Sequence, residues 1–309
     1  MLKPTSSAVV ALLLGLGLTT TAQAQSRIFV AAQGLDSNPC NFAAPCRTFQ
    51  HAHDVATPGG EIDVLDPAGY GSLIITKAIS IQGHGFSGIS TASGDAIVIN
   101  APTNDKVNLR GLLIDGVGTG TNGITFNTGA VLNIQDCLIR KFLGSGIRFV
   151  PSATSKLAVS NTLVADIRDG GILIEPTGSG TVLGVIDHTT TEAIYGSATV
   201  AIFVVGSSST GTVDVTITDS VVALNAAEGI SASSVGAATV INVRNSTIVN
   251  NIGNSAVSAV GGKATLRVSG SILSRNFDGF STANGGTIVS YGDNINTDGG
   301  SPTTTGTKQ

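Results

Sequence analysis

The stretch Leu132-Asn-Ile134-Gln-Asp136 decides the fold, because its pattern returns five more times along the chain. The later copies are Leu157-Ala-Val159-Ser-Asn161, Leu183-Gly-Val185-Ile-Asp187, Val215-Thr-Ile217-Thr-Asp219, Ile241-Asn-Val243-Arg-Asn245 and Leu266-Arg-Val268-Ser-Gly270. The copies recur about every 25 residues, and their alternation of apolar and polar residues marks each one as a short strand. A fixed repeat of this kind predicts a solenoid in which every copy forms one coil.

A turn residue ends each of these strands. Asp and Asn tolerate left-handed backbone and bond to nearby amides, so they allow the same bend in every coil. The sequence therefore predicts a structural turn ladder of Asp136, Asn161, Asp187, Asp219 and Asn245, with a row of metal ligands as the alternative. Three positions after the turn residue stands an apolar residue in every copy except the third, which has Thr190. An inner column is predicted from Ile124, Ile147, Ile172, Ile202, Ile230 and Val257.

The first 24 residues have the features of a signal peptide. Lys3 precedes an apolar run from Ala8 to Leu18, and Ala22-Gln23-Ala24 suits cleavage after Ala24. The run is too short to span a bilayer, and a retained anchor is the alternative. No later stretch is apolar enough to cross a membrane. We expect a soluble protein, secreted or periplasmic.

Composition restricts the partners and the domain count. The net charge of -4 offers no concentrated basic surface, so no nucleic-acid partner is expected. Hydrophobic residues make up 41% of the chain, enough for a continuous core of roughly nine or ten coils. The predicted divisions are an N-terminal strand, cysteine loop and cap helix over 25–60, coils over 61–293 and a polar tail over 294–309, with a helix from Thr48 to Ala56 covering the first coil.

Export makes a disulfide possible. Cys40 and Cys46 share one loop, and we predict that they pair. Cys137 stands alone directly after Asp136, where the other copies have Thr162, His188, Ser220, Ser246 and Ser271. We interpret Cys137 as a small residue in a stack of turns rather than as a reactive thiol.

Two regions resemble a known superfamily. The first comprises Phe29 to Cys40, Ala44 to Phe49, Pro58 to Val64 and Ile75 to Gly83; the second is the apolar-x-apolar-x-Asx signature from Leu132 onward. Together they resemble the secreted bacterial right-handed parallel β-helix proteins of the pectate-lyase-like superfamily. The resemblance implies an all-β, single-stranded, right-handed parallel β-helix with an N-terminal capping α-helix. It leaves the activity open, because this fold carries lyases, glycosidases, esterases, tailspikes and adhesins.

The best candidates for chemistry come from aligning the coils. Five positions beyond the turn ladder lie Lys141, Asp166 and Glu192, which we expect to stack as candidate catalytic residues. Like charges one coil apart would raise the pKa of one carboxylate, as an acid/base pair requires. The substrate-binding candidates are Arg140, Arg148, Arg168, Asp169 and Phe203. An ordinary row of solvated ion pairs explains the same ladder, and we favour that interpretation.

Two functions follow from these patterns. We favour an exported, non-catalytic scaffold at the surface or in the periplasm that binds a glycan or a protein, because the outward columns are plain and Phe203 is their one convincing ring. The alternative is a lyase or hydrolase acting on an acidic polysaccharide. Such lyases hold calcium with acidic residues, so Ca2+ enters only under the lyase alternative; otherwise no cofactor or metal is expected. The Gly83-His84-Gly85 triplet resembles one in polygalacturonases, but the accompanying motifs are missing, so His84 receives no role.

Overall fold

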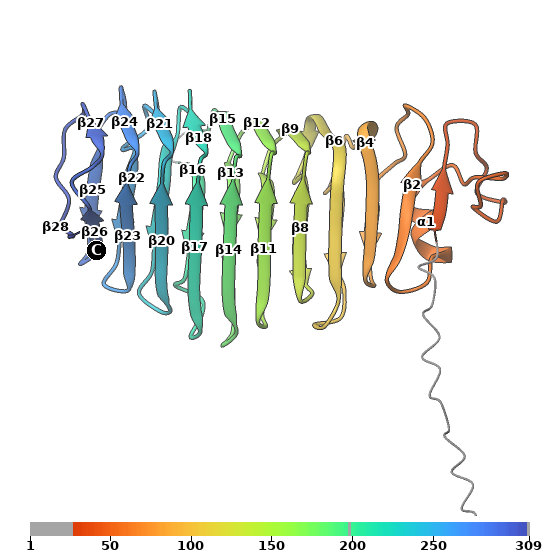
Figure 1. Ribbon diagram of the computed structural model, residues 1–309, viewed down its shortest axis with the longest axis horizontal. Coiled ribbons are helices and arrows are strands. Elements are labelled where there is room, and N and C mark those ends of the chain that lie inside the picture. Colours follow the sequence, from red (N-terminus) through yellow and green to blue (C-terminus); the bar gives the residue numbers. More distant parts are fainter. Residues whose placement is uncertain (1–26, 197–198, 308–309) are drawn as a thin grey trace, which may run out of the picture.

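Parallel strands wind into one right-handed solenoid of about nine turns, which confirms the predicted fold (Figure 1). The computed structural model describes residues 27–196 and 199–307, so the predicted signal peptide lies outside the described residues. Each regular turn contributes one strand to a nine-stranded sheet and two strands to a 19-stranded sheet that bends around the other sides. No helix in these ranges is long and apolar enough to cross a membrane.

The nine-stranded sheet forms one side of the solenoid. Its strands are β3 (Leu73–Ile75), β5 (Ile97–Asn100), β7 (Ile124–Thr128), β10 (Ser145–Phe149), β13 (Gly170–Ile174), β16 (Val200–Val205), β19 (Glu228–Ser233), β22 (Val257–Val260) and β25 (Phe280–Ala283).

The 19-stranded sheet contains a row of longer strands and a row of shorter ones. The first row is β1 (Arg27–Val30), β2 (Gly60–Val64), β4 (Ile79–Ser90), β6 (Lys106–Gly120), β8 (Val131–Gln135), β11 (Ser155–Ser160), β14 (Thr181–Asp187), β17 (Thr212–Thr218), β20 (Ala238–Arg244), β23 (Ala264–Ser269), β26 (Thr287–Ser290) and β28 (Thr304–Thr305). The second is β9 (Leu138–Phe142), β12 (Leu163–Ile167), β15 (Thr190–Ile194), β18 (Val221–Ala223), β21 (Thr247–Val249), β24 (Ile272–Ser274) and β27 (Ile295–Asn296), and β4 and β6 bend through both rows.

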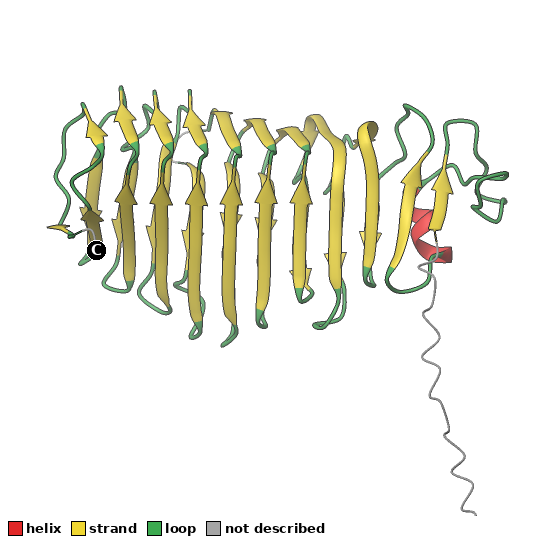
Figure 2. Ribbon diagram, viewed as in Figure 1, coloured by secondary structure: helices red, strands yellow, loops and turns green. Residues whose placement is uncertain are grey.

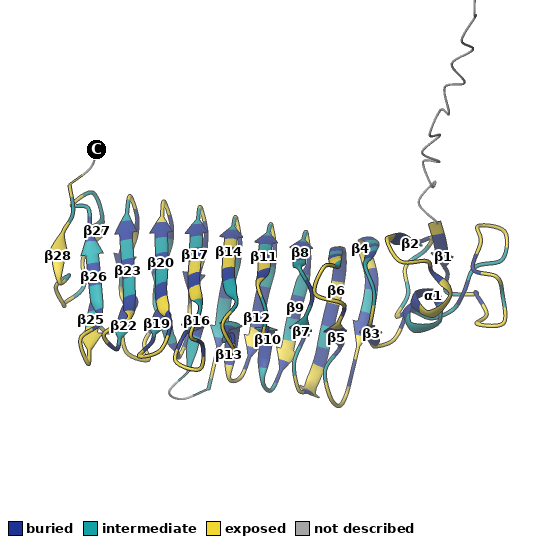
Figure 3. Cartoon of the chain, turned by 90° about the horizontal axis from the view of Figure 1, so that it is seen from below, coloured by how far each residue is buried: buried dark blue, intermediate teal, exposed yellow. Residues whose placement is uncertain are grey.

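The core follows the predicted alternation, with buried and more exposed residues taking turns along the strands (Figure 3). The predicted inner column is confirmed. Its members are buried and pair from turn to turn: Ile124, Ile147, Ile172, Ile202, Ile230 and Val257. The apolar side chains therefore stack into one continuous core along the solenoid.

The turn ladder is confirmed in four turns and wrong in the third. Asp136, Asn161, Asp219 and Asn245 have left-handed backbone, but in the third turn the left-handed residue is His188. Asp187 is instead the last residue of β14, where it pairs with Ser160 of β11 on the preceding turn. The third copy is thus displaced by one residue relative to the predicted alignment.

This displacement reverses the faces of β14. Leu183 and Val185, aligned with inward residues in the sequence, are 44% and 48% exposed, while Val182 and Ile186 are buried. A shift of one residue turns every side chain of a strand to the other face. The same displacement explains why Thr190 breaks the rule that an apolar residue stands three positions after the turn. The residue that pairs with Val164 and is buried there is Thr191, one position later.

The predicted cap helix is confirmed as α1 (Phe49–Val55), the red segment beside the first turns in Figure 2. Thr48 caps it by accepting a hydrogen bond from the backbone N–H of His51. The Gln50 side chain accepts a hydrogen bond from the backbone N–H of Ile74, and the His53 side chain accepts one from the backbone N–H of Thr76. The helix therefore covers the core and also satisfies donors along the free edge of β3.

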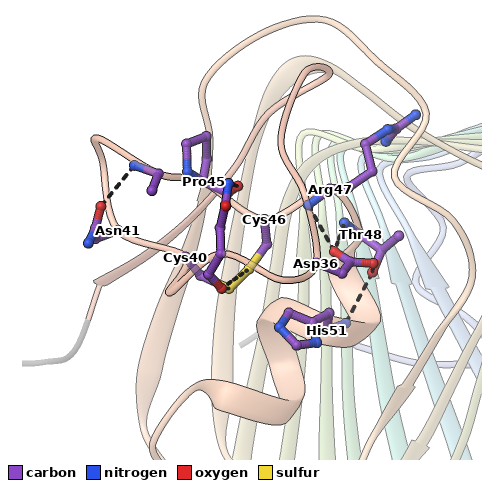
Figure 4. Close-up of a disulfide and its surroundings, with 10 residues drawn as sticks. Asp36, Cys40, Asn41, Pro45, Cys46, Arg47, Thr48 and His51 are labelled. Carbon is purple, nitrogen blue, oxygen red and sulfur yellow. Dashed lines mark hydrogen bonds between the residues drawn. A yellow bond between two sulfur atoms is a disulfide. The ribbon is translucent and has the colours of Figure 1, made fainter.

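The predicted disulfide between Cys40 and Cys46 is present (Figure 4). Its loop pairs with the outer edge of β1, since the Phe29 N–H donates to the Cys40 carbonyl and the Cys46 N–H donates to the Phe29 carbonyl. At the other end, the Thr303 N–H donates to the Ile288 carbonyl as the chain returns along β26. Both terminal segments lie against the ends of the solenoid.

Candidate functional site

The outer face of the nine-stranded sheet carries a pocket of about 200 Å3. Register places Gly170 between Ser145 and Val200 on the neighbouring turns, and Gly170 has no side chain to fill the space between them. Leu173 and Phe203 stack on adjacent turns beside this gap. The pocket is lined by Ser145, Asp169, Gly170, Ile172, Leu173, Thr199, Val200 and Phe203.

The pocket combines apolar and polar side chains. Leu173, Val200 and Phe203 contribute apolar lining, and Asp169 contributes a carboxylate. The Arg168 Nε atom donates to Asp169 Oδ1 across 2.7 Å, which fixes that carboxylate. An aromatic ring in a concave, mostly apolar site with a few polar groups suits a sugar ring, whose C–H face is apolar and whose rim bears hydroxyls.

Glu228 lies on the next turn, where register pairs it with Val200. Its carboxylate accepts a hydrogen bond of 2.9 Å from Ser255 Oγ. Burial raises the pKa of Glu228, and the hydrogen bonds from Ser258, Ser255 and Asn254 only partly oppose this effect. Glu228 is therefore a half-buried acid next to an apolar pocket, an environment typical of proton donors in enzymes.

Asp95 has a similar arrangement toward the other end of this face. Thr125 Oγ1 donates to Asp95 Oδ2 across 2.6 Å, and Asn122 Nδ2 donates to Oδ1 across 2.9 Å. Neither carboxylate was predicted from the sequence. In the sequence, both carboxylates share one position. Each stands two residues before a buried Ile of the nine-stranded sheet, as in Asp95-Ala-Ile97 and Glu228-Gly-Ile230.

The predicted catalytic ladder forms only in part. Arg140 pairs with Ala165, so Lys141 and Asp166, one position further, occupy equivalent left-handed positions. Glu192 pairs with Ala165 and not with Asp166, and Ala193 takes the left-handed position of that turn. The expected stack of all three residues is wrong at Glu192, because the third copy is displaced by one residue.

The binding candidates divide between two faces. Asp169 and Phe203 line the pocket, and Arg148 pairs with Leu173 on the same face. Arg140 lies on the short-strand row, where its Nε atom is 2.9 Å from Asp115 Oδ2, and the Lys141 Nζ atom is 3.9 Å from the same oxygen. The catalytic roles of Lys141, Asp166 and Glu192 stay predictions.

A separate group at the third turn could ligate a metal ion. Asp187, His188 and Asp219 bring ligand atoms within 4.8 Å of one another. His188 Nδ1 lies 2.8 Å from Asp187 Oδ2, and Thr218 Oγ1 donates to Asp187 Oδ1. These contacts lower the pKa of Asp187, chiefly through Thr218, and the Asp187 hydrogen bond raises the pKa of His188. Without any metal ion, Asp187 and His188 already bond to each other as an exposed ion pair.

Comparisons with known proteins identify the fold. No protein-family model matches the chain, and no curated protein matches it. A crystal structure of pectate lyase Pel9A is similar, with a TM-score of 0.59 and 13% identity over 91% of this chain and 80% of the other. The A-module of mannuronan C-5 epimerase AlgE4 from Azotobacter vinelandii matches with a TM-score of 0.36 and 11% identity over 82% and 90% of the two chains. The chain has a pectate-lyase-like right-handed β-helix fold.

Proposed function

We propose that this protein is an exported, non-catalytic β-helix that binds a polysaccharide across the outer face of its nine-stranded sheet. The pocket around Phe203 is the observation that carries the proposal. A sugar ring would lie on Phe203 and Leu173, and its hydroxyls would bond to Asp169 and Ser145. An extended polymer suits this face, because the columns of outward residues continue over successive turns.

Arg148 adds a donor beside the pocket. Its guanidinium makes no ion pair or side-chain hydrogen bond with any residue in the described ranges, so its donors are available to a ligand. The planar N–H groups of arginine bind a carboxylate in pairs and can also donate singly to hydroxyls. A polysaccharide with some uronic acid is therefore compatible with this surface.

Export rests on two observations of different kinds. The predicted signal peptide precedes the described residues, and the disulfide between Cys40 and Cys46 is of the type that persists in oxidising compartments. We propose a secreted or periplasmic location. Fractionation of cells that express the full chain, together with the N-terminal sequence of the mature protein, tests this location and cleavage after Ala24.

Titration of the purified protein with neutral and acidic polysaccharides tests the binding function. We expect Phe203→Ala to weaken binding roughly twofold to tenfold, since ring contacts contribute about 0.5–1.5 kcal/mol. Phe277→Ala is the matched control, because Phe277 is 72% exposed and does not line the pocket. Equal binding by the two variants would exclude this pocket as the site.

A polysaccharide-cleaving enzyme is the second candidate, and Glu228 is the observation that favours it. A half-buried carboxylic acid with a raised pKa beside the pocket could donate a proton to a leaving oxygen. The assay follows new reducing ends and unsaturated products, with and without calcium. Turnover that is lost in Glu228→Gln but kept in Asp95→Asn would establish this activity, and Asp166→Ala tests the candidate predicted from the sequence. If no substrate is turned over, the enzyme candidate is rejected and the binding function remains the proposal.

A further inference from the structure

A second concavity, of about 350 Å3, lies on the outer face of the long strands β4, β6, β8 and β11. This sheet face is different from the one that carries Phe203. We name the concavity the amide groove, after its principal residues Gln82, Asn108, Asn133 and Gln135. Its four strands belong to successive turns about 4.8 Å apart, so its length is roughly 14 Å.

The groove exists because one column of outward residues becomes short. Register places Asn108, Asn133, Ala158 and Val185 on successive turns. Ala158 leaves space where its neighbour Asn133 extends a longer side chain. On the next turn, the Val185 side chain projects outward, because the third copy is displaced by one residue. The groove is therefore open along the amides and bounded by an apolar side chain.

Hydrogen bonds orient the amides in one column. Asn133 Nδ2 donates to Asn108 Oδ1 across 2.7 Å, and Asn108 Nδ2 donates to Ser80 Oγ across 2.9 Å. In the neighbouring column, the side chains of Gln82 and Gln135 bond to no other residue in the described ranges. Fixed amides beside amides with free donors and acceptors suit a ligand that offers many hydroxyls.

The charge in the groove is balanced. Arg110 stands between Gln82 and Gln135 in the register, and its Nε atom is 3.0 Å from Asp136 Oδ2. Because this cation already has a carboxylate partner, an anionic ligand gains little net attraction. We propose that the amide groove is a second binding site, which takes a short segment of uncharged oligosaccharide. This site stands independently of the polysaccharide site around Phe203.

Calorimetric titration with cellopentaose, xylopentaose, mannopentaose and, as an acidic probe, an oligogalacturonate tests the proposal. We expect at least one neutral pentasaccharide to bind the folded protein, with an affinity that changes little with salt. Ala158→Phe should fill the groove and weaken this binding at least about tenfold. Thr216→Phe is the matched control, because Thr216 continues the same column beyond Val185 and outside the groove.

Two further variants keep the result interpretable. Gln135→Ala removes a free amide with little change in shape, so it tests the groove even where Ala158→Phe fails to fold. In the Phe203→Ala background, which disables the other site, a neutral pentasaccharide should still bind, and adding Ala158→Phe should abolish this remaining binding, which separates this site from the one around Phe203. The proposal is overturned if no neutral pentasaccharide binds, if only the oligogalacturonate binds, or if Gln135→Ala and folded Ala158→Phe both bind like the unchanged protein.

Discussion

The Nε2 atom of His53 accepts a hydrogen bond from the backbone N–H of Thr76 across 3.1 Å. His53 is 1% exposed, and its Nδ1 atom lies 3.3 Å from Asp54 Oδ1. An imidazole that accepts at Nε2 must be neutral there, with its proton on Nδ1. The junction between the cap helix and the first turn therefore depends on an uncharged histidine.

This dependence predicts a loss of stability in mild acid. Burial lowers the pKa of His53 below its ordinary value, Lys77 lowers it further, and Asp54 opposes them. The unfolded chain therefore binds a proton at higher pH than the folded one, so the contribution is complete above about pH 6.5 and declines as the pH falls below it. Melting temperatures measured between pH 8 and pH 4.5 should show this decline.

His53→Gln should flatten that part of the pH profile, because glutamine does not titrate. His51→Gln, on the same helix, is the control and should keep the profile of the unchanged protein. A profile that His53→Gln leaves unaltered would show that another group causes the acid sensitivity.

Shortening the Asn251 side chain should strongly destabilise the protein. Asn251 is fully buried, accepts from Asn225 Nδ2 across 2.7 Å and donates to the Val222 carbonyl and to Asn276 Oδ1. Asn251→Ala would leave several buried partners unsatisfied, and each costs about 1–3 kcal/mol. We expect the free energy of unfolding to fall by about 3 kcal/mol or more in urea titrations. Asn242→Ala, on the outer face, should cost far less.

Leu224 predicts a gain in stability on substitution. Its φ of 58° is left-handed and its side chain is 63% exposed, so leucine pays the steric cost of this conformation without burying much area. Leu224→Asn should stabilise the protein by about 1 kcal/mol, because asparagine tolerates this conformation. Leu183→Asn, at an exposed extended position, should give no gain. Equal shifts of the melting temperature in both variants would contradict the explanation.

Cys137 should be inert in the folded protein. Burial raises the pKa of its thiol to about 11, so almost no thiolate is present near neutral pH. A thiol reagent should label Cys137 only after denaturation. Cys137→Ser should cost less than about 1 kcal/mol, because the Ser220, Ser246 and Ser271 hydroxyls each bond to a nearby carbonyl at the same place in other turns. Rapid labelling of the native protein would refute this.

The sequence predicted the features that repeat and failed where one residue breaks the repeat. Leu183-Gly-Val185 and Val182-Leu-Gly184 both present small or apolar residues at alternate positions, so the pattern fits either register. Neighbouring strands decide between them, and Glu192 was misplaced with the rest of its turn. Phe203 was recognised as an outward ring, but the pocket beside it depends on Gly170 from another turn. Only the register reveals that gap.

The loop closed by Cys40 and Cys46 covers a strand edge through which molecules of this protein could associate. A solenoid of parallel strands ends in rows of unpaired backbone groups, and such a row can accept the last turn of another copy. Repeated addition of this kind would produce a fibre. The loop pairs with Phe29 and occupies that row on β1. It therefore opposes head-to-tail polymerisation, and its disulfide keeps the barrier in place in an oxidising environment.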